Sequence, residues 1–149
     1  MDEVFKIKKD RERAEDLLTM AKERLGLIKI YPREKPYKII EEYYEIIKEL
    51  LTSVMYLDGM KTLSHVGLIK YFKDNYSFLE DFEISLIETL RKFRHGIVYY
   101  GKKISSDFLL NYEKEINSVI KKLVLFAGEK LKWGKKAKLK NSGDQICSE

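Results

Sequence analysis

Residues 40–59 read IEEYYEIIKELLTSVMYLDG, and this stretch decides the fold class. Its apolar residues recur at steps of three and four, so they share one face of a helix. These residues are Ile40, Tyr43, Tyr44, Ile47, Leu50, Leu51, Val54 and Leu57. Gly59 follows them, and glycine commonly ends a helix. The stretch therefore predicts a long amphipathic helix with one buried side.

The same spacing predicts a helix on each side of this one. An earlier helix carries its apolar face over residues 14–25, and Pro32 and Pro36 then mark a loop. After the central stretch, Ser64 stands where a helix cap is expected, ahead of the apolar residues Leu68 and Ile69. The second and third helices are therefore close neighbours in the chain.

Two more helices are expected in the second half of the chain. Ser77 followed by Glu80 resembles a capping box for the fourth helix, and Ser105 or Ser106 can begin the fifth. Their inward faces are expected to hold Leu79, Phe82, Leu86, Leu90, Phe93 and Ile97, then Leu109, Tyr112, Ile116, Val119, Leu123 and Phe126. No segment shows sustained strand alternation. The prediction is an all-α, up-down bundle of about five helices.

Composition indicates one domain with a basic end. A chain of 149 residues with 44% hydrophobic residues is enough for a single core. Residues 130–149 hold six lysines against two acidic residues, which is most of the net charge of +5. We expect residues 1–130 to form the bundle and residues 131–149 to be a basic, disordered tail. A tether for phosphates is the alternative role of the tail.

Composition also bears on the cell compartment. The single glutamine, Gln145, and the single cysteine, Cys147, both lie near the C-terminus. Such avoidance of thermolabile residues resembles the amino-acid usage of heat-adapted proteins. One cysteine cannot form an intramolecular disulfide, and the sequence has neither a signal peptide nor an apolar run of membrane-spanning length. We expect a cytoplasmic protein that does not enter a membrane.

The segment 91–101, RKFRHGIVYYG, concentrates the chemistry of the chain near the end of the fourth helix. Arg91 and Arg94 can hold phosphate oxygens through planar guanidinium groups. His95 can transfer a proton near neutral pH, and Tyr99 and Tyr100 add two phenols. These five residues are the candidate site.

This segment and its surroundings resemble the HEPN family, whose motif is an Arg followed after four to six intervening positions by a His. The resemblance also rests on residues 43–59, on the segment Ser64-His65-Val66-Gly67-Leu68, and on Tyr99-Tyr100-Gly101 before a last helix. It covers roughly residues 10–130. The family consists of small helical bundles.

The resemblance implies a homodimer with a cleft between the two motif helices. Some members of the family are metal-independent endoribonucleases, in which the His moves protons and the Arg stabilises the charged transition state. Many of these are toxins paired with a small nucleotidyltransferase antitoxin, whereas other members are inactive and bind nucleotides or partners. Neither a cofactor nor a metal is implied.

Two alignments of the motif compete. Arg91 and His95 leave three intervening residues, one fewer than the family minimum. If Arg94 is instead the motif Arg, Tyr99 or Tyr100 stands where the His belongs, and a phenol with a pKa near 10 is a poor base at pH 7. We favour the second alignment. It predicts a non-catalytic or weakly active subunit that binds RNA or nucleotide, with an active ribonuclease as the alternative.

The charged residues of the predicted helices also have purely structural interpretations. Helical geometry puts Arg94 at the edge of the apolar face, where pairing with Glu42, Glu45 or Glu49 would explain it without any function. We otherwise expect these glutamates to form a solvated face. His65, just after a helix cap, is expected to be structural, and the two histidines have no ligand spacing for zinc.

Overall fold

Five helices and one short pair of strands make up the computed structural model, which describes residues 3–147, with side chains for residues 3–134. The elements are β1 (Val4–Lys6), α1 (Arg11–Leu27), a 3-10 turn (Ile28–Ile30), α2 (Pro36–Asp58), β2 (Met60–Thr62), α3 (His65–Asn75), α4 (Asp81–Tyr100) and α5 (Asp107–Cys147). The prediction of five helices is confirmed.

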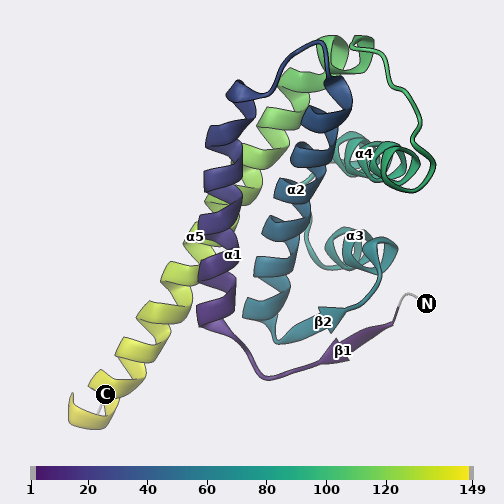
Figure 1. Cartoon of the computed structure of the whole chain (residues 1–149). Helices are drawn as coiled ribbons and strands as arrows, with labels where there is room; N and C mark the ends of the chain where they lie inside the picture. Colours follow the sequence, from purple (N-terminus) through teal and green to yellow (C-terminus); the bar gives the residue numbers. More distant parts are fainter. Residues whose placement is uncertain (1–2, 148–149) are drawn as a thin grey trace.

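The helix axes lie along two different directions and do not form a single up-down bundle. Figure 1 shows α1, α2 and α5 side by side along a common direction, while α3 and α4 are seen almost end-on beside α2. α1 runs antiparallel to α2 and α5, and these two are parallel to each other, so among these three helices the predicted up-down alternation holds for α1 and α2 only. Helical spacing reports which face of a helix is buried, and it does not report the angle at which two helices cross.

A two-stranded antiparallel sheet was not expected. β1 pairs with β2 in a register that places Val4 opposite Thr62 and Lys6 opposite Met60. Three-residue strands are too short for alternation to be visible in the sequence. Gly59 makes the pairing possible, because it has a φ of +71° and an added Cβ would lie 3.0 Å from the main-chain oxygen of Ile7.

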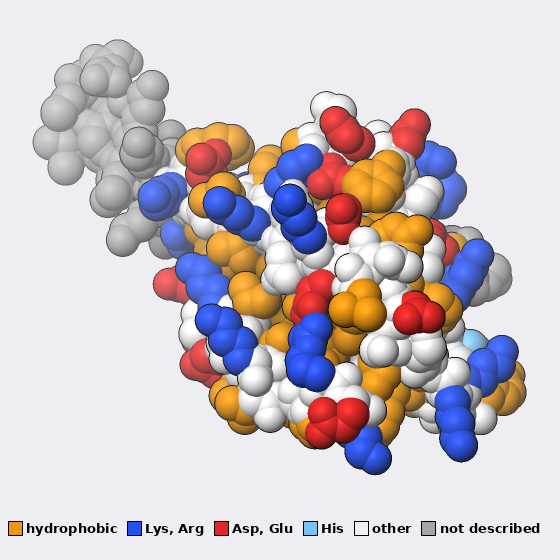
Figure 2. Space-filling view, turned by 90° about the horizontal axis from the view of Figure 1, so that it is seen from above, with side chains coloured by type: hydrophobic (Ala, Val, Ile, Leu, Met, Phe, Trp, Pro, Cys, Tyr) orange, Lys and Arg blue, Asp and Glu red, His pale blue; other side chains and the backbone are white. Residues whose placement is uncertain are grey.

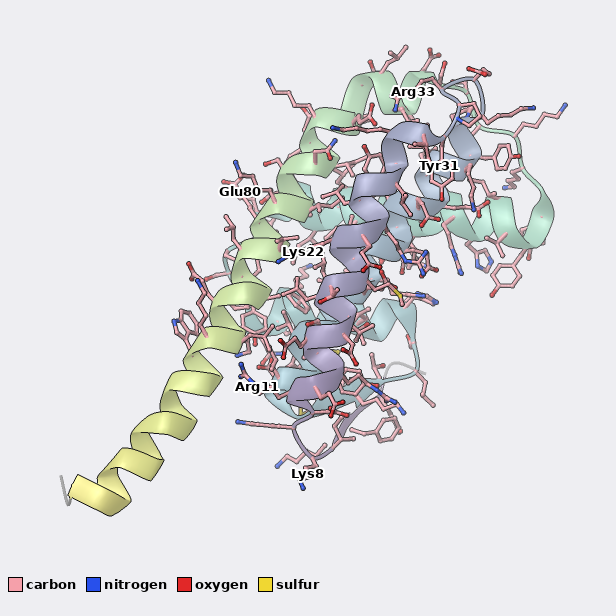
Figure 3. The ribbon with its side chains drawn as sticks, turned by 60° about the vertical axis from the view of Figure 1, so that its left-hand side comes forward. Lys8, Arg11, Lys22, Tyr31, Arg33 and Glu80 are labelled. Carbon is pink, nitrogen blue, oxygen red and sulfur yellow. The ribbon has the colours of Figure 1, made fainter. Side chains whose placement is uncertain are left out.

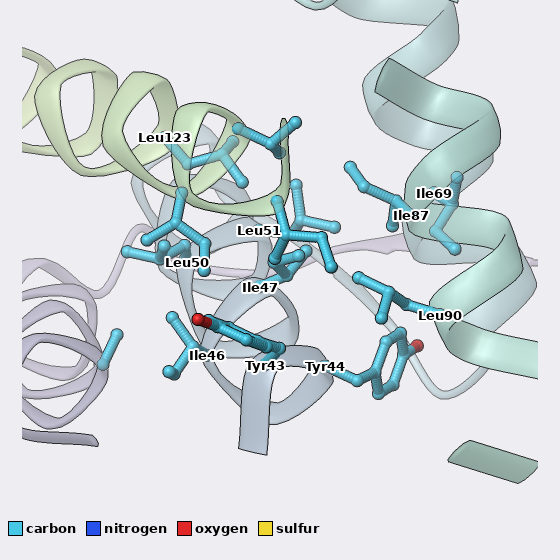
Figure 4. Close-up of a cluster of buried hydrophobic side chains, with 14 of the residues drawn as sticks. Tyr43, Tyr44, Ile46, Ile47, Leu50, Leu51, Ile69, Ile87, Leu90 and Leu123 are labelled. Carbon is cyan, nitrogen blue, oxygen red and sulfur yellow. The ribbon is translucent and has the colours of Figure 1, made fainter. Parts of the chain in front are cut away.

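The core lies around α2, which is buried along nearly its whole length. Figure 4 shows α2 side chains packed between those of α5 on one side and those of α3 and α4 on the other. Tyr43, Tyr44, Leu50 and Leu51 of α2 and Leu123 of α5 are each at most 2% exposed. The amphipathic face predicted for this helix is confirmed, and the opposite face is buried too.

Burial of that opposite face corrects one prediction. Glu42 and Glu49 are buried, not solvated. Arg24 of α1 satisfies both, with its Nη1 donating to Glu42 at 2.9 Å and its Nε donating to Glu49 at 3.0 Å. Charged groups at a helix interface need such partners, because an unpaired buried charge is costly. α1 and α2 are therefore held together by side-chain ion pairs as well as by apolar packing.

Two further polar clusters connect distant parts of the chain. Asp58, at the end of α2, accepts hydrogen bonds from Tyr71 and Tyr76 and pairs with Lys130 of α5 at 2.8 Å. Near the opposite end, Arg33 pairs with Glu113 of α5 (Figure 3 labels Arg33 at the connection between α1 and α2). These clusters attach α5 to both ends of α2.

The start of α4 differs from the expected one. The capping box is formed by Glu80 and Glu83, three residues after the predicted pair. Phe82 then lies on the outer face, 50% exposed, and Ile84 and Ile87 are buried instead. Glu83 also accepts a hydrogen bond from Lys122 of α5 at 2.8 Å. Tyr112, expected to face inward, is likewise exposed.

Helix α5 continues to Cys147. The predicted tail of residues 131–149 lies largely outside the residues whose side chains are described, and its disorder stays a prediction. Within the described part of the chain, no helix is both long enough and apolar enough to cross a membrane.

Candidate functional site

The C-terminal end of α4 carries a long basic segment without acidic residues. Residues 91–106 contain five lysines and arginines and no aspartate or glutamate. Gly101 ends the helix with a φ of +61°, and Lys102 and Lys103 follow in an exposed connection to α5. The positive surface at the end of α4 is therefore supplied by the exposed Lys92, Lys102 and Lys103, since Arg91 and Arg94 pair with glutamates.

Three aromatic rings lie on this surface and form what we call the α4 surface cluster: His95, Tyr99 and Tyr100. The ring of His95 lies 4.7 Å from that of Tyr99 and 5.8 Å from that of Tyr100, measured between centroids. His95 is exposed, and Tyr99 and Tyr100 are 63% and 71% exposed. Seen from above, the molecular surface mixes basic, acidic and hydrophobic side chains, with a histidine beside basic groups at one edge (Figure 2).

Arg91 and Arg94 point away from this cluster, towards the junction of α2, α3 and α4. Arg91 donates to Glu88, with Nε and Nη2 each 3.0 Å from a carboxylate oxygen. Arg94 lies 3.6 Å from Glu45 of α2, and its guanidinium carbon lies 6.0 Å from the centre of the Tyr44 ring. Of the three glutamates considered as structural partners for Arg94, Glu45 is the one that it meets.

His65 belongs to the same junction. The Tyr44 hydroxyl and His65 Nδ1 lie 2.8 Å apart. Burial raises the pKa of Tyr44, so the phenol stays protonated and we assign it as the donor. Burial, and next the positive charges of Lys48 and Arg94, lower the pKa of His65. The imidazole is therefore neutral at pH 7, with its proton on Nε2.

The five predicted site residues thus fall into two groups. His95, Tyr99 and Tyr100 gather at the end of α4. Arg91 pairs with Glu88, and Arg94 contacts Tyr44 and Glu45 at the inner junction. Across the described residues, no hydrogen bond or ion pair joins the groups. Sequence reasoning missed the Tyr44–His65 pair because the two residues lie on different helices, 21 positions apart.

The described residues hold no group of three or more His, Cys, Asp or Glu side chains that could bind a metal ion. Comparison of the chain with protein-family models, with curated proteins and with solved structures found no match.

Proposed function

We propose that the protein binds RNA or a nucleotide through the α4 surface cluster. One observation carries this proposal: the adjacent exposed rings of Tyr99 and Tyr100 stand within a basic segment that contains no acidic residue. Single-stranded nucleic acids are bound by this combination, in which aromatic rings stack on bases and cations meet phosphates. The resemblance to the HEPN family supports the same role.

The strength of such binding can be approximated from the number of rings. Stacking contributes about 1–3 kcal/mol for each base, so two tyrosines supply about 2–6 kcal/mol. Lys92, Lys102 and Lys103 are exposed and can neutralise phosphates, which makes the binding dependent on salt. Together these terms favour a short single strand rather than a duplex, whose bases are already stacked.

The contacts of Arg91 and Arg94 support a binding subunit that is non-catalytic or weakly active. Stabilisation of a pentavalent phosphorane needs guanidinium groups aimed at the phosphate. Here Arg91 and Arg94 are turned to Glu88 and Glu45, away from His95. We therefore propose the binding subunit of a toxin–antitoxin-like pair, whose partner is a small nucleotidyltransferase. An adjacent gene encoding such an enzyme would support the pairing.

Fluorescence anisotropy with a labelled, single-stranded RNA that ends in a 5′-hydroxyl tests the proposal. Tyr99→Ala together with Tyr100→Ala should weaken binding at least tenfold, since each 1.4 kcal/mol corresponds to a factor of ten. Tyr37→Ala is the matched control, because Tyr37 is also an exposed helical tyrosine, 45% exposed on α2. Equal affinities of the three proteins would refute the proposal.

Metal-independent ribonuclease activity is the second candidate, favoured by the exposure of His95 one turn from Arg91. In that reaction the base removes the 2′-hydroxyl proton, the 2′-oxygen attacks phosphorus, and the 5′-oxygen leaves with a proton from the acid. Cleavage in EDTA that leaves 2′,3′-cyclic phosphate ends, and that His95→Ala reduces about 10²–10⁴-fold, would establish it. We expect little or no cleavage by the wild type.

We also propose that the functional form is a homodimer with α4 at or near the interface. Phe82 near the start of this helix and Val98 near its end are each about half exposed, which supports separate apolar contacts with a second copy. Light scattering at high micromolar concentration should give twice the mass of the 17.7 kDa chain. A strict monomer there would exclude this assembly.

A further inference from the structure

A cavity of about 220 Å³ lies beside the C-terminal half of α2, where β2 leads into α3. In Figure 1, β2 lies below α3 and leads into it. The polar lining residues of the cavity are Lys48, Thr52 and Tyr56 of α2, Lys61 and Thr62 of β2, Ser64, and His65 of α3. Apolar side chains, including Met55 and Leu68, complete the wall.

The charge of this lining is one-sided. Among the residues whose side chains the structure describes, no aspartate or glutamate lines the cavity, whereas two lysines do. A neighbouring cavity, on the other side of Thr52 and Tyr56, is lined by three acidic residues, Asp10, Glu12 and Asp16, and by one basic residue, Arg13. An anion is therefore attracted to the first cavity and repelled from the second.

Hydrogen-bond donors accompany the positive charge. Because the Tyr44 phenol donates to Nδ1 of His65, the Nε2–H of the neutral ring is the donor that remains. The Thr62 hydroxyl accepts from the main-chain N–H of Ser64, at 3.3 Å, and keeps its own proton for donation. Lys48 is held 2.8 Å from Glu45, which itself lies outside the lining. The lining thus combines two cations, of which Lys48 is paired with Glu45, with two hydrogen-bond donors.

We propose that this cavity binds a phosphate monoester, with Lys48 and Lys61 neutralising the phosphate and His65 and Thr62 donating hydrogen bonds to its oxygens. Oxygens of a phosphate dianion are strong acceptors for such groups. The volume is below the roughly 300–1,000 Å³ of sites for drug-sized ligands, so it suits a phosphate with its sugar. A free mononucleotide and the 5′-phosphate end of an RNA share this chemistry. The inference does not depend on the α4 surface cluster.

Titration of the intact protein with inorganic phosphate, followed through the imidazole resonances of His65 by NMR, tests the proposal. We expect a saturable shift and a higher pKa for His65 when phosphate is bound, because a nearby dianion favours imidazolium. The shift should be absent when sodium chloride is added to the same ionic strength. His95 does not line this cavity, so a response of its resonances reports separately on the α4 surface cluster.

Two variants test whether phosphate binds in this cavity. Lys61→Gln should weaken phosphate binding about tenfold, since a charge-assisted hydrogen bond contributes about 1.5–3 kcal/mol. Lys73→Gln removes the same charge from an exposed position of α3 outside the cavity and should leave the affinity unchanged. No saturable shift, or a shift that Lys61→Gln leaves unaltered, would overturn the proposal.

Two further probes distinguish the source of the phosphate. A shift with AMP but none with a 5′-phosphorylated RNA identifies a free mononucleotide, and the reverse identifies an RNA end. Binding of 5′-hydroxyl RNA reports on the α4 surface cluster alone. Retention of that binding with no response of His65 to phosphate would refute the cavity and leave the proposed function standing, and loss of both would refute both.

Discussion

Replacing Arg24 with Met should destabilise the protein in a pH-dependent way. In the folded protein Arg24 donates to both Glu42 and Glu49, which are 7% and 6% exposed. The variant keeps much of the apolar stem and removes the charge, so that two buried carboxylates lose their partner. Removal of one member of a buried ion network is far more damaging than replacement of the whole network.

The magnitude follows from the burial of the three groups. Breaking a fully buried pair costs about 3–5 kcal/mol. The Arg24 side chain is 32% exposed, which lets water solvate the carboxylates in part, so we expect a loss of about 2–3 kcal/mol at pH 7. For a chain of this size, the Tm should fall by about 5–10 °C.

The pH dependence separates lost charge from lost packing. Burial already raises the pKa of Glu49, while Arg24 opposes that rise. A carboxyl group whose pKa is higher in the folded protein does not affect stability below its unfolded pKa, near 4.3. As the pH rises from there through the raised folded pKa, the group destabilises the folded protein progressively. Without Arg24 the folded pKa rises further. The deficit of the variant should therefore be larger at pH 7 than at pH 4.5.

Urea unfolding at both pH values measures the deficit. Lys22→Met is the matched control, because it removes an exposed cation from the same helix. Adding Glu42→Leu and Glu49→Leu to the Arg24 variant should recover most of the loss, since an apolar replacement of all charges leaves nothing unpaired. A deficit that is equal at the two pH values, or that the control reproduces, would refute the reasoning.

Three further outcomes concern the fold, each measured as a change in the free energy of unfolding or in Tm. Gly59→Ala should cost at least about 1 kcal/mol more than Gly101→Ala, since both have positive φ but only the first would press a Cβ against a main-chain oxygen. Leu123→Ala should cost about 2–5 kcal/mol, against at most about 0.5 kcal/mol for the exposed Leu110→Ala. Removing residues 134–149 should change the Tm by less than about 2 °C, because almost no apolar periodicity follows Trp133.

Periodicity was sufficient to predict where the helices lie, because each helix buries a stripe that recurs along its own sequence. Periodicity was insufficient where the partner of a charged side chain lies on another helix. Glu42 and Glu49 resemble a solvated face until Arg24 of another helix is placed against them. The angle at which α3 and α4 cross the other helices similarly depends on the contacts between helices, and the apolar periodicity of α3 or α4 alone does not predict it.

Local chemistry was ambiguous at the candidate site for the same reason. A capping box needs an acceptor and a Glu three residues later, and Ser77 with Glu80 and Glu80 with Glu83 both satisfy that spacing. His65 was predicted to be structural because it follows a helix cap, and its contact with Tyr44 could not be predicted because that contact depends on how α3 meets α2. Helical spacing placed Arg94 correctly at the edge of the core, and the choice of Glu45 required the structure.

The location of RNA on the protein is the most direct test of the proposed function. Backbone amide chemical shifts of the isotope-labelled chain should be recorded while a 5′-hydroxyl single-stranded RNA is added at low salt. The account predicts perturbations concentrated at residues 95–103, at the end of α4. Saturating additions that leave these amides unperturbed, or that perturb chiefly the outer face of α1, would contradict it.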